Sequence, residues 1–126
     1  MAAGKNDEAI SMIEKAIRLN PITPSWYFHY LGACYANAGR YEEAIEAVNM
    51  AIQKNANNPL LWLSLAAYNG LIDRDEKARE ATKEFLKRYP SASIKKLKSY
   101  GHGRYKDPAR EKFWLDAYHK AGIPEN

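Results

Sequence analysis

The residue types most able to do covalent or metal chemistry are scarce in this sequence. It has three histidines and one cysteine, Cys34, and they are scattered along the chain. No serine or cysteine has a histidine and an acid at a spacing typical of a nucleophilic site. The histidines and the cysteine also form no cluster with zinc-ligand spacing. We therefore expect no catalytic residue, no metal and no cofactor in this chain.

The remaining reactive groups also have plain structural interpretations. Glu42, Glu43 and Glu46 lie together and are typical of the first turn of a helix, where the helix dipole favours negative charge. His102 stands between two glycines, but it lacks the strand–loop–helix context that a phosphate-binding loop needs. Cys34 lies on an apolar face, and we interpret it as a small core residue.

A sequence motif occurs three times at a nearly fixed spacing. Residues 4–10 read GKNDEAI, residues 39–45 read GRYEEAI, and residues 73–79 read DRDEKAR. Self-similarity at a period of 34 to 35 residues indicates stacked structural repeats. A short repeat cannot bury its apolar face alone, so it packs on its neighbours and leaves an extended surface for a partner. This organisation favours binding over catalysis.

The repeats read as helices throughout. Apolar residues recur at helical spacing and no stretch alternates with period two, so we expect an all-α fold without a sheet. Prolines and glycines mark the ends of the segments. Within each pair the helices are expected to cross at small residues, with Gly32 facing Ala44 and Ala66 facing Ala78. The expected helices cover about residues 6–19, 25–38, 41–53, 60–71 and 75–88.

This pattern resembles the tetratricopeptide repeat family, whose signature is Trp-x2-Leu-Gly-x2-Tyr, then Ala-x3-Phe, then Pro. The middle copy has Phe28, Leu31, Gly32, Tyr35 and Ala44 at these positions. The third copy has Trp62, Leu65, Ala66, Asn69, Ala78, Phe85 and Pro90. Two departures stand out: Asn69 replaces the tyrosine, and Ala56 replaces the closing proline of the middle copy.

The resemblance implies a right-handed superhelical stack over residues 1–90. It would contain a half repeat at 4–21 and full repeats at about 25–58 and 59–90. We expect residues 91–126 to form a helical cap, with a short basic helix from Ser91 to about Tyr100 and a second helix that begins at Asp107-Pro108. The inward stripe of this second helix is expected to be Phe113, Trp114, Ala117, Tyr118 and Ala121.

The first helix would have no partner on one face. We expect either that the chain is the C-terminal piece of a longer protein, or that it forms a homodimer through residues 6–19. A narrower resemblance favours the first alternative. Residues 105–109 (YKDPA) and 120–125 (KAGIPE) are similar to the end of bacterial proteins in which a class III adenylate/guanylate cyclase domain, or a winged-helix regulator domain, precedes such repeats. The chain would then be the regulatory or assembly region of a signalling protein.

In this family the first helix of each pair lines a concave groove, so the resemblance also implies a binding surface. An apolar helix or an extended peptide would suit such a groove. For Trp26 and Leu63 the alternative is packing against a neighbouring helix. Some family members clamp a chaperone carboxylate with Asn and Lys, but Ala33, Ala67 and His29 occupy those positions here, so we expect no clamp. The candidate groove residues are Trp26, His29, Ala33, Ala36, Asn37, Asn57, Asn58, Leu60, Leu63, Ala67, Gly70 and Leu71.

The net charge of +4 is unevenly spread, because residues 79–112 alone carry +7. This basic third could contact nucleic acid. We favour a solvated helical surface, because a basic patch is only the first of several features that indicate a nucleic-acid-binding protein. No apolar run is long enough to span a bilayer, and no signal peptide begins the chain. The single cysteine fits a reducing compartment, so we expect a cytoplasmic protein. We expect its partner to be a protein or peptide. The candidate basic patch is Lys95, Lys96, Lys98, Arg104 and Lys106.

Overall fold

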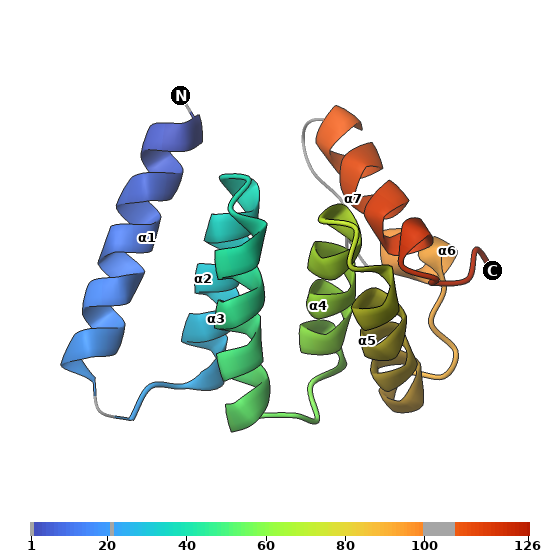
Figure 1. Cartoon of the computed structure of the whole chain (residues 1–126), viewed down its shortest axis with the longest axis horizontal. Coiled ribbons are helices and arrows are strands. Elements are labelled where there is room, and N and C mark those ends of the chain that lie inside the picture. The colour runs from blue at the N-terminus through green and yellow to red at the C-terminus, as the bar shows by residue number, and fades with distance from the viewer. Residues whose placement is uncertain (1, 21, 100–107) are drawn as a thin grey trace.

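The protein is a row of helices. The computed structural model describes residues 2–20, 22–99 and 108–126, and it has no strand within them. Figure 1 shows α1 to α5 following one another along the long axis, with α6 and α7 at the far end. The expected all-α repeat fold is confirmed. In chain order the helices are α1 (Ala2–Leu19), α2 (Ser25–Asn37), α3 (Tyr41–Lys54), α4 (Pro59–Leu71), α5 (Asp75–Arg88), α6 (Ile94–Ser99) and α7 (Pro108–Lys120).

Local sequence signals set the ends of these helices. Oδ1 of Asn58 accepts a hydrogen bond from the backbone N of Leu60 at 3.0 Å, while Pro59 occupies the first helical position of α4. An oxygen acceptor followed by proline satisfies the free donors at a helix start. The bounds of α2 to α5 therefore lie within one residue of those expected, whereas α1 begins at Ala2 rather than near residue 6.

The two complete repeats turn in the same way between their helices. Gly39, before α3, has a φ of 79°, and Asp73, at the equivalent place before α5, has a φ of 60°. Glycine takes this left-handed conformation at little cost, and aspartate is one of the few other residues that tolerate it. In both turns an arginine amide then donates to a helix carbonyl five residues earlier at 2.9 Å, from Arg40 to Tyr35 and from Arg74 to Asn69.

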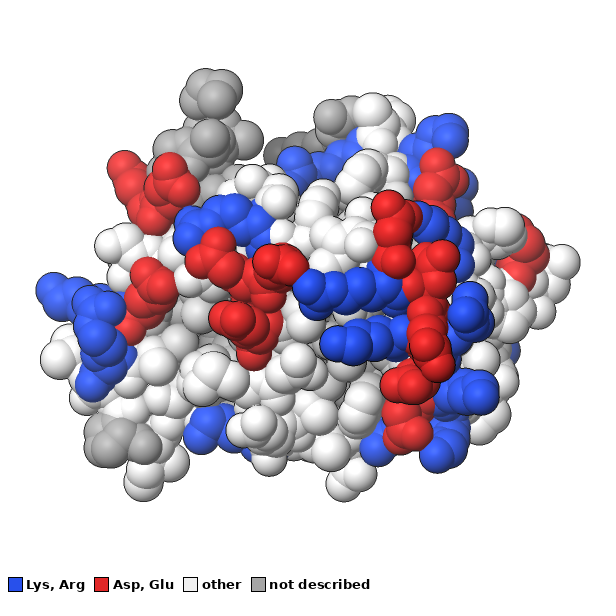
Figure 2. Space-filling model, viewed as in Figure 1, with Lys and Arg blue, Asp and Glu red and all other residues white. Residues whose placement is uncertain are grey.

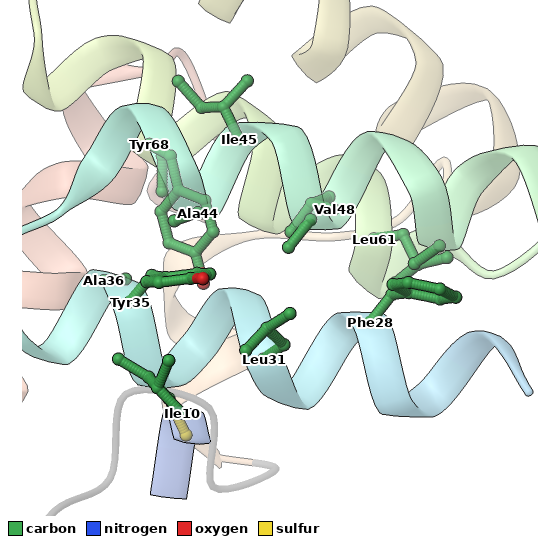
Figure 3. Close-up of a cluster of buried hydrophobic side chains, with 14 of the residues drawn as sticks. Ile10, Phe28, Leu31, Tyr35, Ala36, Ala44, Ile45, Val48, Leu61 and Tyr68 are labelled. Atoms are coloured by element: carbon green, nitrogen blue, oxygen red, sulfur yellow. The ribbon is translucent and has the colours of Figure 1, made fainter. Parts of the chain in front are cut away.

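The helices of the second repeat cross where their backbones approach closely. A Cβ atom on Gly32 would lie 2.9 Å from Cγ2 of Val48 and 3.2 Å from the carbonyl oxygen of Ala44. The expected crossing of Gly32 and Ala44 is therefore confirmed. Figure 3 shows Phe28 of α2 beside Leu61 of α4, so side chains of neighbouring repeats share this core.

The cap packs on the last repeat through a second group of buried side chains. Leu97 and Ile123 are buried with Leu63 and Phe85. Two hydrogen bonds join the start of α6 to the chain after α7: the backbone N of Ile94 donates to the oxygen of Pro124 at 2.7 Å, and the next amide donates to the oxygen of Glu125 at 3.1 Å. The segment after α7 is thus held to the start of α6 by these hydrogen bonds and to the last repeat by the buried side chain of Ile123.

One residue of the expected inward stripe of α7 points outward. Phe113 is 43% exposed, whereas Trp114, Ala117 and Ala121 are buried. These three residues are spaced by three and four, so they share one face of the helix, and Phe113 lies at the edge of that face, about 100° from Trp114. The expected start at Asp107 and the end of the basic helix at Tyr100 lie outside the described residues. Within those residues, no helix is long and apolar enough to cross a membrane.

Candidate protein-binding surface

A hollow of about 180 Å³ lies between α2, α4 and α7. Its walls combine small, polar and aromatic side chains, and six of them were candidate groove residues. The structure therefore brings the α2 and α4 candidates together on one surface. The six are His29, Ala33, Asn37, Leu60, Leu63 and Ala67, and the others are Ser64, Tyr68, Trp114 and Tyr118.

The repeat register places these side chains. His29, Ala33 and Asn37 are spaced by four, so they lie along one stripe of α2. Ser64 and Ala67 lie on the matching stripe of α4. Nε2 of His29 is 3.3 Å from Oγ of Ser64, a contact between residues 35 positions apart in the sequence. This polar pair joins the first helices of two successive repeats across the hollow.

Helix α7 covers the α4 half of this surface. The ring of Trp114 meets that of Tyr68 edge to face, with 5.9 Å between the centroids. Leu63, Ala67 and Gly70, which were expected to be open to a ligand, are buried. Part of the expected groove is therefore occupied by the chain itself. The alternative interpretation of Leu63 as a packed residue agrees with its place in the core.

Polar contacts hold both ends of α7. Near its start, a guanidinium nitrogen of Arg110 donates to Oδ1 of Asn37. At its end, Nζ of Lys120 donates to the oxygen of Gly70 at 2.9 Å and to Oδ1 of Asp73 at 3.0 Å. The Asp73 carboxylate raises the pKa of Lys120 above its ordinary value. These contacts are exposed, so they orient the helix more than they stabilise it.

The other candidate groove residues have different surroundings. Trp26 is 60% exposed, and it does not line the hollow. Ala36 is buried and Leu71 is half-buried, and both belong to the central core. Asn57 is exposed on the loop, whereas the side chain of Asn58 caps α4.

Four of the lining residues were not among the candidates. The register leads from His29 to Leu63 and not to Ser64, but Ser64 lies three residues before the candidate Ala67, on the same face of the helix, and this spacing could have indicated it. Tyr68 follows Ser64 by one helical turn. Trp114 and Tyr118 were expected to be buried, but the sequence carries no signal that their helix would pack on α4 rather than beyond α5.

The chemistry of the hollow is that of recognition. It offers an imidazole, a hydroxyl and an amide among apolar walls, and no carboxylate lines it beside the pair of His29 and Ser64. Burial raises the pKa of the Cys34 thiol, which keeps it protonated and unreactive. In the part of the chain that the structure describes, no three His, Cys, Asp or Glu side chains could together hold a metal ion.

The basic residues of the cap do not form a continuous described surface. Lys95 and Lys98 on α6 are exposed, and Lys96 is half-buried. Nζ of Lys98 lies 3.8 Å from Oε1 of Glu111, so one of these charges already faces a carboxylate. The candidates Arg104 and Lys106 lie outside the described residues. The interpretation as a solvated surface remains our prediction.

Comparison with known proteins gives the family. A model of the tetratricopeptide repeat family matches residues 1–68, and a second model of that family matches residues 60–92. The chain belongs to the tetratricopeptide repeat family. Proteins built from these repeats are in general non-catalytic modules for protein–protein interaction.

A solved structure supports the same fold. The crystal structure of MamA is similar to this chain, with a TM-score of 0.66 and 21% sequence identity. The match covers 94% of this chain and 67% of that chain. No curated protein matches the sequence. At this level of identity the likeness shows the arrangement of the repeats, and it says nothing of a shared partner.

Proposed function

We propose that this tetratricopeptide repeat protein binds an extended segment of a partner protein in the hollow between α2, α4 and α7. The observation that carries this proposal is the half-buried pair of His29 and Ser64, which places polar groups inside an apolar depression. Recognition sites typically combine apolar walls with a few polar groups that fix orientation. The family supports the choice of a protein as the ligand.

The size of the hollow favours an extended segment over a helix. A helix with its side chains is about 10 Å across, and α7 already takes up the half of the groove formed by α4. A space of about 180 Å³ suits one side chain. An extended partner could place one residue there and direct its neighbours away, since successive side chains of a strand point to opposite sides.

The experiment is a pull-down from lysate of the source organism. The affinity of the protein for the partner segment identified in this way is then measured. Ala33→Arg places a long charged side chain in the hollow, and it should abolish retention. Gln53→Arg adds the same charge at an exposed position of α3, and it should retain the partner like the wild type. A partner bound equally by both variants would contradict the proposal. Ala67→Arg is a poor choice, because Ala67 is 1% exposed beneath α7.

A second function is favoured by the distribution of exposed apolar side chains. Of the seven large ones in the described residues, five lie between residues 12 and 30: Met12, Leu19, Ile22, Trp26 and Tyr30. Exposed apolar side chains concentrated in this way are typical of interaction sites. We propose that a second copy of the chain covers α1, so that the protein also acts as a homo-oligomerisation element.

The context of the chain is a further part of this proposal. The closing sequence at residues 120–125 is similar to that of proteins with an upstream cyclase or winged-helix domain, so we propose a regulatory role in a cytoplasmic signalling protein. Reading the native gene upstream of Met1 tests this idea. A nucleotidyl cyclase or regulator domain in the same frame would support it, and an unrelated domain would contradict it.

A further inference from the structure

The second repeat uses a tyrosine to fill the space between neighbouring helices. Tyr35 of α2 is 6% exposed, and its hydroxyl donates a hydrogen bond to Oε2 of Glu14 on α1 at 2.7 Å. Ile10 of α1 is buried in the same core. The ring and its acceptor thus complete the contact between α1 and the next pair of helices.

The third repeat lacks this tyrosine, and a cavity lies in its place. The residues one repeat beyond Ile10, Glu14 and Tyr35 are Ile45, Asn49 and Asn69. All three line a cavity of about 540 Å³ between α3, α4 and α5. The Asn69 side chain is too short to fill the space that a phenol ring fills one repeat earlier. A volume of this size is typical of a site for a small ligand.

An unused hydrogen-bond acceptor accompanies the cavity. Asn69 is 2% exposed, and its Nδ2 donates to the backbone oxygen of Leu65 at 2.9 Å. Its Oδ1 is buried and has no hydrogen-bond partner among the residues that the structure describes. A buried carbonyl oxygen without a donor has lost its bond to water without replacement, which is costly. A ligand with an O–H or N–H group would supply the missing donor.

The walls of the cavity are apolar and its rim is charged, with three lysines and two glutamates of α5. Ile45, Leu65 and Ala81 provide apolar surface. Lys77 and Lys83 of α5 line it as well, and they make no hydrogen bond or ion pair with any described residue. Figure 2 shows basic side chains lying across the surface between the acidic groups of α3 and those of α5. Glu80 and Glu84 line the same rim, and Oε2 of Glu84 lies 2.9 Å from Nζ of Lys87, so the entrance carries charges of both signs.

We propose that this cavity binds a phenol group in the position that Tyr35 occupies one repeat earlier. The ring would pack on Ile45 and Leu65, and its hydroxyl would donate to the amide oxygen of Asn69 or of Asn49. Asn49 stands where Glu14 accepts the Tyr35 hydroxyl. The site is formed by the stripe of α4 opposite to the proposed partner-binding hollow, so it is a separate site.

The test is an NMR titration of the ¹⁵N-labelled protein with p-cresol and with toluene. p-Cresol should shift the amide signals around Ile45, Leu65 and Ala81, and it should bind roughly threefold to tenfold more tightly than toluene, as expected for one hydrogen bond. Asn69→Ala keeps the cavity and removes the acceptor, so it should reduce that preference. Asn69→Tyr fills the cavity as in the second repeat, and it should abolish the shifts.

A second variant keeps the test decisive if Asn69→Tyr does not fold. Asn49 is exposed at the rim, so Asn49→Trp should block the entrance without disturbing the core. Shifts of equal size in both blocked variants, or no shift in the wild type, would overturn the proposal. Equal binding of p-cresol and toluene by the wild type would also overturn it. Ala33→Arg should leave the shifts unchanged, which separates this site from the hollow.

Titration with the peptide acetyl-Glu-Tyr-Glu-amide distinguishes the source of the phenol. Binding of this peptide, with loss on replacement of its tyrosine by phenylalanine, would identify a tyrosine side chain of a partner as the ligand. Binding of p-cresol without binding of the peptide would identify a free small phenol. Both results support a phenol site, and they assign it to different partners.

Discussion

The position where α2 crosses α3 has no room for a single added methyl group. We expect Gly32→Ala to lower the free energy of unfolding by about 1–3 kcal/mol, the usual cost of overpacking, because the new Cβ would lie 2.9 Å from Val48 and 3.2 Å from the Ala44 carbonyl. Urea unfolding followed by circular dichroism measures this change.

Gly70 provides the matched control for this prediction. It also lies inside a helix, but a Cβ there would meet Cβ of Ala78 at an ordinary 3.9 Å. Gly70→Ala should therefore gain about 0.5–1 kcal/mol from helix propensity. If both substitutions change the free energy of unfolding in the same direction by the same amount, the close approach of the two backbones is not the reason for glycine at position 32.

The phenol of Tyr35 should make stability depend on pH in the alkaline range. Burial, then the hydrogen bond to Glu14, raise the pKa of Tyr35 to about 12, above its ordinary value of 10.0. Because the folded state holds the proton more tightly, this contribution is complete below pH 10 and is lost as the pH rises towards 12. Urea unfolding at several pH values should show wild type losing stability relative to Tyr35→Phe over this range. A constant difference between the two would contradict the assignment.

Residue types predicted the packed positions better than the exposed ones. Gly32 and Cys34 were predicted as close-packed residues because their place in the repeat specifies their neighbours. The orientation of Phe113 was not predicted correctly, since neighbouring residues 113 and 114 are both aromatic and the tertiary contact alone selects Trp114. The cavity beside Asn69 was not predicted either, although the missing tyrosine was its visible sign.

At the scale of elements, the docking of α7 should depend on one aromatic side chain. Trp114 is 6% exposed against the central core, so Trp114→Ala should lower the free energy of unfolding by about 3–5 kcal/mol. Phe113→Ala removes the adjacent exposed ring, and it should lower the free energy of unfolding by well under half of that amount. Urea unfolding compares the two variants, and amide hydrogen exchange shows whether α7 is released. Equal losses would mean that α7 is not docked through Trp114.

The helices of the repeats could be predicted from local signals, but the place of α7 could not. Helices α2 to α5 are specified by turns and a periodic apolar stripe, with the added cap of Asn58 at α4, all of which act within a few residues. The contact of α7 with α4 joins residues such as Trp114 and Tyr68, which are far apart in the chain. A sequence pattern shows which face of such a helix is apolar, but not the surface on which that face packs. The contact of α7 with α4 was therefore not predicted, and the expected groove was wider than the hollow.

The whole molecule has an uneven distribution of apolar surface. The exposed apolar side chains concentrate at the α1 end, and α7 covers the opposite end. In a repeat array each unit normally buries its face against the next one. This asymmetry is the basis of our proposal that a second copy of the chain packs on α1.

We expect the protein to self-associate through α1. Met12 and Leu19 are 71% and 73% exposed, and at a spacing of seven they lie on one face of the helix. The double variant Met12→Glu, Leu19→Glu should shift the light-scattering mass to that of one chain, because each carboxylate would be buried without a partner. Ile13 is unsuitable for this test, since it packs against the core. Met50→Glu, at an exposed position on α3, should leave the mass unchanged. A wild-type mass equal to one chain across a concentration series would show that α1 is not covered by a second copy.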